Sequence, residues 1–353
     1  MTEPAPIPVF DGHNDVLLRL LKAHAGSAET AFIDGTETGH IDLPRSRQGN
    51  FVGGMFAMFA PSLEKSDSLD GMKGGAYAVP LPAELGVADA QEATTAMASI
   101  LLRLERAGAL SVCRTVAEIR AAVAREALAA VFHIEGCEAI DTDFRMLDLL
   151  YAAGLRSLGI VWSRPNAFGH GVPFSFPSTP DTGPGLTDAG RELVRVCNER
   201  RIVIDLSHLN EKGFWDVAEL SSAPLVATHS NAHSICPHAR NLTDRQLDAI
   251  RESRGMVGLN FATGFLRPDG SMSADTSLEI MVRHVDALIE RLGEDGVGLG
   301  SDYDGATVPA EIRDVAGLPR LFDALRAHGY DDALLRKLGT ENWYGVLERT
   351  WGA

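Results

Sequence analysis

His13 and Asp15 are separated by one residue, at the point where a short apolar lead, residues 7–10, gives way to polar residues. In an extended strand, side chains two positions apart lie on the same side of the backbone, so this imidazole and this carboxylate can bind one cation together. The pair alone is weak evidence, because His and Asp at strand ends often only satisfy nearby backbone groups. Its meaning depends on whether further ligands end later strands.

Four more side chains of the same kinds end later apolar runs. They are Glu135 after residues 129–134, His208 after 202–207, His229 after 224–228 and Asp302 after 296–301. Imidazole nitrogens and carboxylate oxygens suit Zn²⁺, and a carboxylate can bridge two metal ions. Two neighbouring ions activate a shared water and stabilise a developing oxyanion. The recurrence of these ligands at strand ends therefore predicts a metal site and favours hydrolysis.

Short apolar, β-branched runs alternate with helical patterns along the chain. Eight runs are candidate strands, at 8–11, 51–59, 128–134, 157–162, 202–206, 225–228, 256–260 and 297–300. Helical patterns lie between them at 88–107, 116–127, 144–153, 188–200, 211–221, 244–253 and 278–291. Strands that alternate with helices predict a parallel sheet, and eight such units can close on themselves. We therefore expect one (β/α)8 TIM-like barrel domain over residues 1–353, with the metal site at the carboxyl ends of the strands.

Two further patterns refine this expectation. Thr115, Thr187 and Thr243 each precede a helical pattern and are candidate N-caps. Three stretches, 26–50, 61–82 and 169–185, lack a regular pattern and follow strands, which places them on the rim where barrel active sites lie. We expect walls or lids over the site, although ordinary surface loops explain any one of them equally well.

Composition limits the class of partner and the compartment. The formal net charge of −16 disfavours nucleic acid and anionic membranes, because the long-range field repels both. The first residues do not resemble a signal peptide, and no apolar run reaches the length of a membrane span. The four cysteines are widely spaced and form no C-x-x-C pair, so we expect reduced thiols in a cytoplasmic protein. Cys137 lies close to Glu135, but the oxygen and nitrogen ligands already suit zinc.

Six motifs occur in an order that resembles the membrane (renal) dipeptidase family of the amidohydrolase superfamily. They are Asp11-Gly12-His13-Asn14-Asp15, Ile134-Glu135-Gly136, Asp205-Leu206-Ser207-His208, Thr228-His229-Ser230-Asn231, Ala239-Arg240-Asn241 and Ser301-Asp302-Tyr303-Asp304-Gly305. The resemblance extends over nearly the whole chain.

The resemblance implies two zinc ions per chain and a role for several of the motif residues. His13 and Asp15 would hold one ion, His208 and His229 the other, and Glu135 would bridge them. Arg240 would bind the carboxylate of the substrate, a contact suited to guanidinium, and Asp302 would transfer the proton. Asp304 competes with Asp302, and we expect it to have a supporting or structural role.

One position departs from the family pattern. The family often has a histidine at the end of the fourth strand, which contacts the scissile carbonyl, and this position corresponds to Trp162. Indole can donate one hydrogen bond but cannot act as a cationic donor. The role passes to Arg164, Asn166 or His170 on the following loop, or it is missing.

Two other residues near the motifs keep open roles. His133 shares the strand face of Glu135, so it supports the site or packs in the core. Asp205 either orients a ligand or caps a turn.

The resemblance suggests a zinc dipeptidase in which a metal-bridging hydroxide attacks the peptide bond of a short peptide, with tolerance for a D residue at the C-terminal position. One alternative is a binuclear metal amidohydrolase that acts on N-acyl amino acids or another small amide or ester, because fold alone does not fix chemistry. A non-catalytic barrel binding protein is disfavoured by the intact ligand set. A homodimer is the commonest closed assembly, but the sequence does not specify it.

Overall fold

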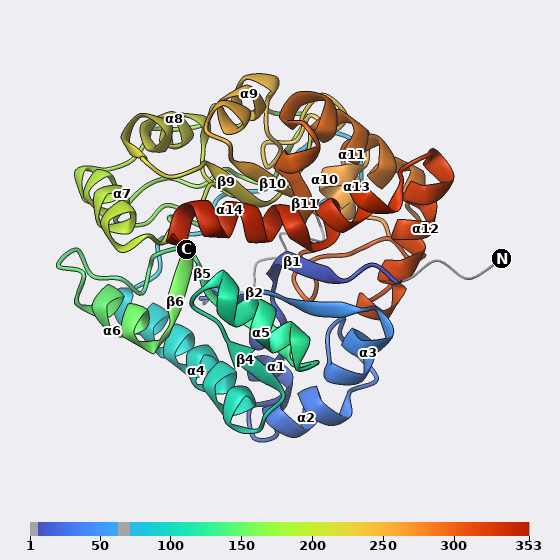
Figure 1. Cartoon of the computed structure of the whole chain (residues 1–353). Helices are drawn as coiled ribbons and strands as arrows, with labels where there is room; N and C mark the ends of the chain where they lie inside the picture. The colour runs from blue at the N-terminus through green and yellow to red at the C-terminus, as the bar shows by residue number, and fades with distance from the viewer. Residues whose placement is uncertain (1–5, 63–70, 353) are drawn as a thin grey trace.

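The alternating apolar runs form a closed barrel of eight parallel strands in the computed structural model, which describes residues 6–62 and 71–352 (Figure 1). In order around the barrel, the strands are β1 (Val9–Asn14), β2 (Phe51–Phe59), β5 (Leu128–Glu135), β6 (Leu155–Gly159), β8 (Val203–Asp205), β9 (Val226–Ser230), β10 (Met256–Leu259) and β11 (Val297–Leu299). The parallel pairing of β11 with β1 and of β2 with β5 completes the ring. The predicted (β/α)8 barrel is confirmed, and each of the eight candidate strands is present.

Helices surround the strands on the outside of the barrel (Figure 1). Those that match predicted helices are α4 (Val87–Arg106), α5 (Val116–Ala124), α6 (Arg145–Ala153), α7 (Asp188–Arg200), α8 (Glu211–Leu220), α9 (Asp244–Glu252) and α11 (Leu278–Leu292). The three predicted N-caps are confirmed: Thr115 and Thr187 accept backbone N–H groups, and Thr243 forms a capping box with Gln246. Within the described ranges, no helix combines the length and hydropathy that crossing a bilayer requires.

Several elements were not expected from the sequence. They are α1 (Val16–His24), α2 (Ala28–Asp34), α3 (Leu43–Gln48), β4 (Leu110–Val112), α10 (Thr263–Leu266), α12 (Leu318–His328), α13 (Asp332–Arg336), α14 (Asn342–Trp351), 3₁₀ turns at Glu294–Gly296 and Val315–Gly317, and a π-helical turn at Lys337–Glu341. The expectation of an irregular stretch at 26–50 is wrong, because it contains α2 and α3. Each has seven residues or fewer, too short to show a clear helical period.

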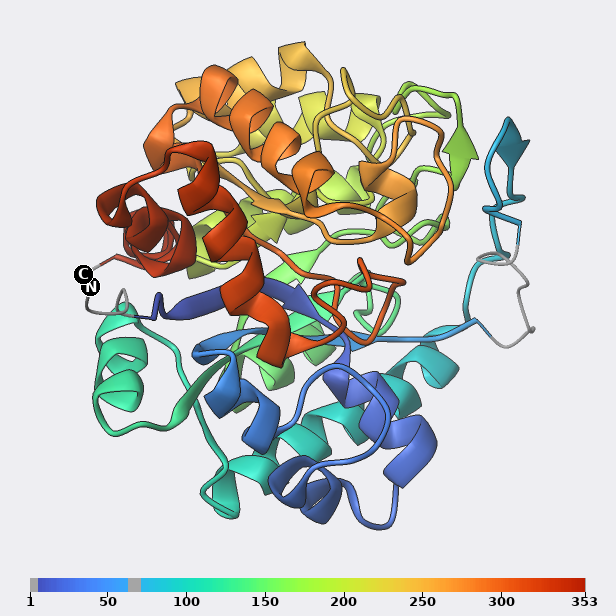
Figure 2. The same ribbon diagram turned by 90° about the vertical axis from the view of Figure 1, so that its right-hand side faces the viewer.

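The other two irregular stretches meet at the rim. β3 (Tyr77–Ala78) comes from the stretch 61–82, of which 63–70 lie outside the described residues, and it pairs antiparallel with β7 (Ser175–Phe176) from the stretch 169–185. The Tyr77 hydroxyl also donates a hydrogen bond to the Gly270 carbonyl at 2.8 Å. Figure 2 shows β3 and β7 at the right, on the opposite side of the barrel from α14 at the left.

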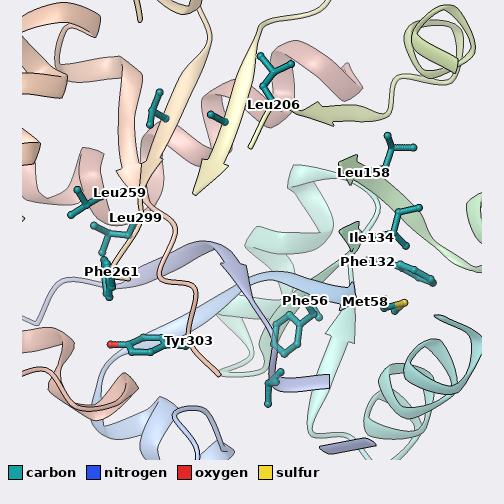
Figure 3. Close-up of a cluster of buried hydrophobic side chains, with 14 of the residues drawn as sticks. Phe56, Met58, Phe132, Ile134, Leu158, Leu206, Leu259, Phe261, Leu299 and Tyr303 are labelled. Atoms are coloured by element: carbon teal, nitrogen blue, oxygen red, sulfur yellow. The ribbon is translucent and has the colours of Figure 1, made fainter. Parts of the chain in front are cut away.

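Side chains of β5 alternate between the barrel interior and the surrounding helices, as strand geometry requires. Phe132 and Ile134 belong to the large cluster that packs strands against helices, and Figure 3 shows both beside Met58 of β2. Val131 belongs instead to the smaller cluster that includes Trp343 of α14. His133 and Glu135 continue this second face toward the carboxyl end of the strand.

Trp343 fills the amino end of the barrel. Its side chain is fully buried, its indole N–H donates to the Leu299 carbonyl at 2.9 Å, and its ring lies 6.5 Å from that of Phe10. α14 crosses this end of the barrel in Figure 1. The interior is therefore apolar at the amino end, and the polar residues gather at the carboxyl end.

Candidate metal centre

The structure brings together all five predicted metal ligands and Asp302 at the carboxyl ends of the strands. Among the clusters of ligand atoms that lie within 4.8 Å of one another, one consists of Glu135, His208 and His229, and another of His13, Asp15 and Asp302. Each of these residues lies within three positions of the end of β1, β5, β8, β9 or β11. The parallel barrel thus collects side chains that are far apart in the sequence.

The Glu135 carboxylate lies between the two groups. Its Oε1 is 3.0 Å from His208 Nε2 and 3.5 Å from His229 Nε2. Its Oε2 is 3.7 Å from His13 Nε2, which in turn lies 3.5 Å from Asp15 Oδ2. One carboxylate therefore presents one oxygen to each group, which is the arrangement that a bridging ligand needs.

The charges and the burial of this cluster fit bound cations. Both ring nitrogens of His13 are buried without a hydrogen-bond partner in the described part of the chain. Burial alone would lower the pKa of His13, but the Glu135 and Asp15 carboxylates raise it to about 10. Burial raises the pKa of Glu135 well above its usual value, although His13 opposes this shift. The buried carboxylates of Asp15, Glu135 and Asp302 lie around the unpartnered nitrogens of His13. Such a donor set suits divalent metal ions.

His229 is oriented by Asp205 through Thr228. The Thr228 hydroxyl lies 2.6 Å from Asp205 Oδ2 and 2.8 Å from His229 Nδ1. Asp205 Oδ1 also accepts backbone N–H groups from Ser207 at 3.0 Å and from Thr228 at 2.8 Å. Asp205 therefore contacts both the hydroxyl beside a predicted ligand, His229, and the backbone of a turn.

His208 is held by a different hydroxyl group. The Ser163 hydroxyl lies 2.8 Å from His208 Nδ1, which leaves Nε2 directed at Glu135. Such outer contacts set the ring orientation and basicity of metal-bound histidine. Ser163 and Thr228 were not predicted, because the partner of a hydroxyl cannot be read from its position in the chain.

Two of the predicted site residues adopt strained backbone conformations. His208 has φ 67° and Asp302 has φ 59°, both in the left-handed region that non-glycine residues rarely adopt. Gly136, directly after Glu135, has φ 76°. Strain at such positions is common where surrounding structure holds functional side chains in place.

Asp302 lies beside the His13 group and is fixed by a residue that was not predicted. The Asn260 side-chain amide donates to Asp302 Oδ2 at 3.0 Å. Burial raises the pKa of Asp302, and the neighbouring His13 opposes the shift. Asp304 points elsewhere: its Oδ1 accepts the His40 backbone N–H at 2.6 Å and lies 3.1 Å from Arg19 Nε. Asp304 therefore fastens the segment before α3 to the barrel.

Arg240 places a buried cation next to the ligands. Its Nη2 donates to the His229 carbonyl at 3.1 Å, and its guanidinium lies 5.3 Å from the centre of the Phe265 ring. Burial lowers the pKa of Arg240 to about 10, while Asp302 and Glu135 act in the opposite direction.

Of the four candidates after the fourth barrel strand, only Trp162 contacts a predicted ligand. β6 ends at Gly159, so Trp162 lies on the following loop, with its ring 5.8 Å from that of His208. Arg164 pairs with Glu138 at 2.6 Å. Asn166 donates to the Ile160 carbonyl at 2.8 Å, and His170 Nδ1 lies 3.2 Å from the Gly185 carbonyl. The contacts of these last three are internal to the rim loops.

A closed parallel barrel with this donor set at its carboxyl rim defines the class of metal-dependent hydrolases. The chain belongs to the membrane dipeptidase family, peptidase family M19, whose model matches residues 5–351. The family resemblance of the motifs is thereby confirmed, and the protein is a metallo-dipeptidase by family.

Relatives of known structure cover almost the whole chain. The crystal structure of dipeptidase AC, a metallopeptidase of family M19, is 58% identical, with a TM-score of 0.96, over 99% of this chain and 100% of that one. A metallopeptidase from Rhodobacter sphaeroides, solved with a phosphinate mimic of the dipeptide L-Ala-D-Ala, is 58% identical with a TM-score of 0.96 and covers 98% of this chain and 100% of that one. An uncharacterised Klebsiella pneumoniae protein of the pqqA 5′ region is 54% identical over 245 residues, 69% of this chain and 90% of the relative.

Proposed function

We propose that this protein is a zinc-dependent dipeptidase that hydrolyses the peptide bond of short peptides and tolerates a D residue at the C-terminal position. The position of Glu135 between two groups of ligands carries the proposal. The similar Rhodobacter sphaeroides enzyme, solved with a mimic of L-Ala-D-Ala, supports the choice of substrate.

His13 and Asp15 would hold one zinc ion, His208 and His229 the other, and Glu135 would contact both. Bound there, zinc would polarise the scissile carbonyl and lower the pKa of the attacking water. The chain supplies the orientation: Thr228 and Ser163 direct the two Nε2 atoms toward Glu135. No serine or cysteine nucleophile is needed.

Asp302 and Arg240 would act on water and substrate. Asn260 donates to Oδ2 of Asp302, so Oδ1 is the oxygen available to accept a proton and then deliver it to the leaving amine. The Arg240 guanidinium lies next to the predicted ligands and is positively charged at neutral pH. It can bind the free carboxylate of a dipeptide through two hydrogen bonds. Because Arg240 would hold the carboxylate in one place, it would set the position of the scissile bond and limit substrates to short peptides.

The test is hydrolysis of L-L, L-D and D-D dipeptides by zinc-reconstituted enzyme, with C-terminally amidated dipeptides and N-acyl amino acids beside them. We expect L-L and L-D dipeptides with a free carboxylate to be hydrolysed. Arg240→Ala should weaken these substrates and spare amidated ones; equal loss on both would contradict the carboxylate contact. Hydrolysis of N-acyl amino acids alone would favour the alternative amidohydrolase. Protein that binds no zinc and gains no activity on zinc addition would favour a binding protein.

The compartment and the assembly belong to the same proposal. All four cysteines are buried and free, which supports a reducing, cytoplasmic location. A homodimer is proposed as the commonest closed assembly, and the mass of the purified protein by light scattering tests it.

A further inference from the structure

Arg164 is a fully buried cation close to the metal centre that the proposed chemistry does not use. Its Nε donates to Glu138 Oε1 at 2.6 Å, its Nη1 donates to the Ser62 hydroxyl at 3.1 Å, and its Nη2 donates to the Ala60 carbonyl. All three nitrogens are thus directed at the protein. A substrate cannot reach this guanidinium without displacing these partners, so Arg164 is unsuited to direct binding.

The same guanidinium also lies over two aromatic rings. Arg164 Cζ lies 5.4 Å from the centre of the Trp162 ring and 5.5 Å from that of Phe59. These rings are 4.9 Å apart, and Trp162 also contacts Phe174 at 5.6 Å. Trp162 is therefore packed on several sides, and its ring lies 5.8 Å from that of His208.

Trp162 still keeps an accessible surface. It is half-buried, whereas the residues on either side, Val161 and Ser163, are buried. The accessible part of an indole next to a metal ligand is an apolar surface that a substrate can touch. Indole offers one hydrogen-bond donor, so most of this contact is apolar.

Glu138 connects the support to the metal centre. It lies three residues after Glu135, and its Oε2 is so close to Gly136 that a Cβ there would lie 2.3 Å from it. Pairing with Arg164 therefore ties the loop after β5 to the loop after β6. The contact with Ala60 adds the end of β2 to the same assembly.

We propose that Arg164 and Glu138 are positioning residues that hold the indole of Trp162 as an apolar contact surface for the substrate beside His208. This inference rests on the proposed dipeptidase function and deepens it. A planar guanidinium can donate from its edge and stack with its face at the same time, which lysine cannot do. Loss of either partner leaves a buried charge unpaired, so the arrangement is held as a unit. The substrates that benefit are dipeptides with an apolar side chain next to the scissile bond.

The first test is a double-mutant cycle with the best dipeptide substrate of the zinc enzyme. Arg164→Met should raise KM about tenfold while kcat changes less than about threefold, because the lost contact is made equally in the ground and transition states. In a Trp162→Ala background, the same substitution should change KM less than about twofold, because the indole through which it acts is gone. Equal effects of Arg164→Met in both backgrounds would overturn the proposal.

The second test observes the indole directly. In protein labelled with 5-fluorotryptophan, ¹⁹F NMR gives one signal for each of the four tryptophans, and Trp162→Phe identifies the relevant one. Arg164→Met should shift or broaden this signal alone. Arg103→Met is the matched control, since Arg103 Nε also lies 2.6 Å from a carboxylate, that of Glu29, but on the outer helices. An unchanged Trp162 signal would refute the positioning role.

Two milder variants cover the case in which Arg164→Met does not fold. Arg164→Lys keeps the charge and Glu138→Gln keeps the shape. Each should raise KM by less than Arg164→Met does, and each should bind zinc as fully as the wild type. If the wild-type enzyme hydrolyses no dipeptide, the proposed function fails, but the ¹⁹F experiment still decides whether Arg164 positions Trp162.

Discussion

Oε1 of Glu135 lies 3.0 Å from Nε2 of His208, and the other oxygen of the same carboxylate faces His13. The side chain lies between two groups of predicted ligands whose members are far apart in the sequence. Because a carboxylate has two equivalent oxygens, it can serve both groups without moving.

Glu135→Gln should therefore reduce the bound metal from about two ions per chain to about one or fewer, since an amide has a single oxygen that can act as a ligand. The measurement is elemental analysis after gel filtration in metal-free buffer. Glu118→Gln, at the exposed start of α5, is the control and should keep the wild-type content. Full occupancy in Glu135→Gln would show that the carboxylate does not bridge.

Thr228→Val should weaken zinc binding by about 10- to 100-fold, because it removes the hydroxyl between Asp205 and His229. Competition with a chromophoric chelator measures this change. Thr350→Val removes another buried hydroxyl, which donates within α14, and should leave zinc affinity unchanged. Equal affinities in both variants would mean that Asp205 only fixes the turn.

Asp302→Asn should lower kcat by about 10²-fold with zinc still bound, because an amide cannot accept the proton. Steady-state kinetics and metal analysis on the same preparation test this. Asp304→Asn should instead lower the melting temperature and leave kcat nearly unchanged, since Asp304 pairs with Arg19 and accepts the His40 backbone N–H. If the kinetic effects of the two variants were reversed, Asp304 would be the proton carrier.

The sequence predicted the barrel and the convergence of the ligands because both follow from local patterns. Alternation along β5 places His133 and Glu135 on one face, and parallel strands bring their carboxyl ends to one rim. The support of these ligands could not be predicted in the same way. Ser163 contacts His208 across 45 residues, and the Arg164–Glu138 pair joins two loops whose paths no periodicity describes.

The C-terminal region shows the same limit. α14 was not predicted, and nothing in its sequence pattern says that Trp343 enters the barrel rather than packing on its side. Trp162 was expected at a strand end, whereas β6 ends three residues earlier, and the following residues place Ser163 against His208.

His284 should make stability depend on pH below neutrality. Burial lowers its pKa from 6.5 to about 4, and its Nε2 lies 2.9 Å from the Leu266 carbonyl. Below pH 6.5 the unfolded chain takes up a proton that the folded protein does not accept until about pH 4, so stability is present above this window and is lost as pH falls through it. The free energy of unfolding that is lost between pH 6.5 and about pH 4 amounts to roughly 3 kcal/mol.

The comparison is urea unfolding of zinc-depleted wild type and His284→Gln between pH 7 and pH 4. The wild type should lose more stability than the variant over this range, because glutamine can keep the contact but does not titrate. Parallel pH profiles would mean that the pKa of His284 is the same in the folded and the unfolded chain.

Trp343→Ala should reduce the free energy of unfolding by about 3–5 kcal/mol, because it leaves a cavity and removes the hydrogen bond to Leu299. Denaturant unfolding of the metal-depleted protein measures this loss without a contribution from zinc. Trp215→Ala, on the half-buried face of α8, should cost much less.

The indole of Trp343 occupies room that absent side chains provide. A methyl group added at Gly12, Gly258 or Gly298 would lie 2.4, 3.1 or 2.7 Å from atoms of this ring. A smaller residue at 343 would not by itself make room, because an added carbon would also lie 2.4 Å from the Thr228 carbonyl oxygen at Gly12, 2.0 Å from it at Gly258, and 2.4 Å from Met256 Cε at Gly298. This end of the molecule can therefore accept a larger side chain only when several positions change together.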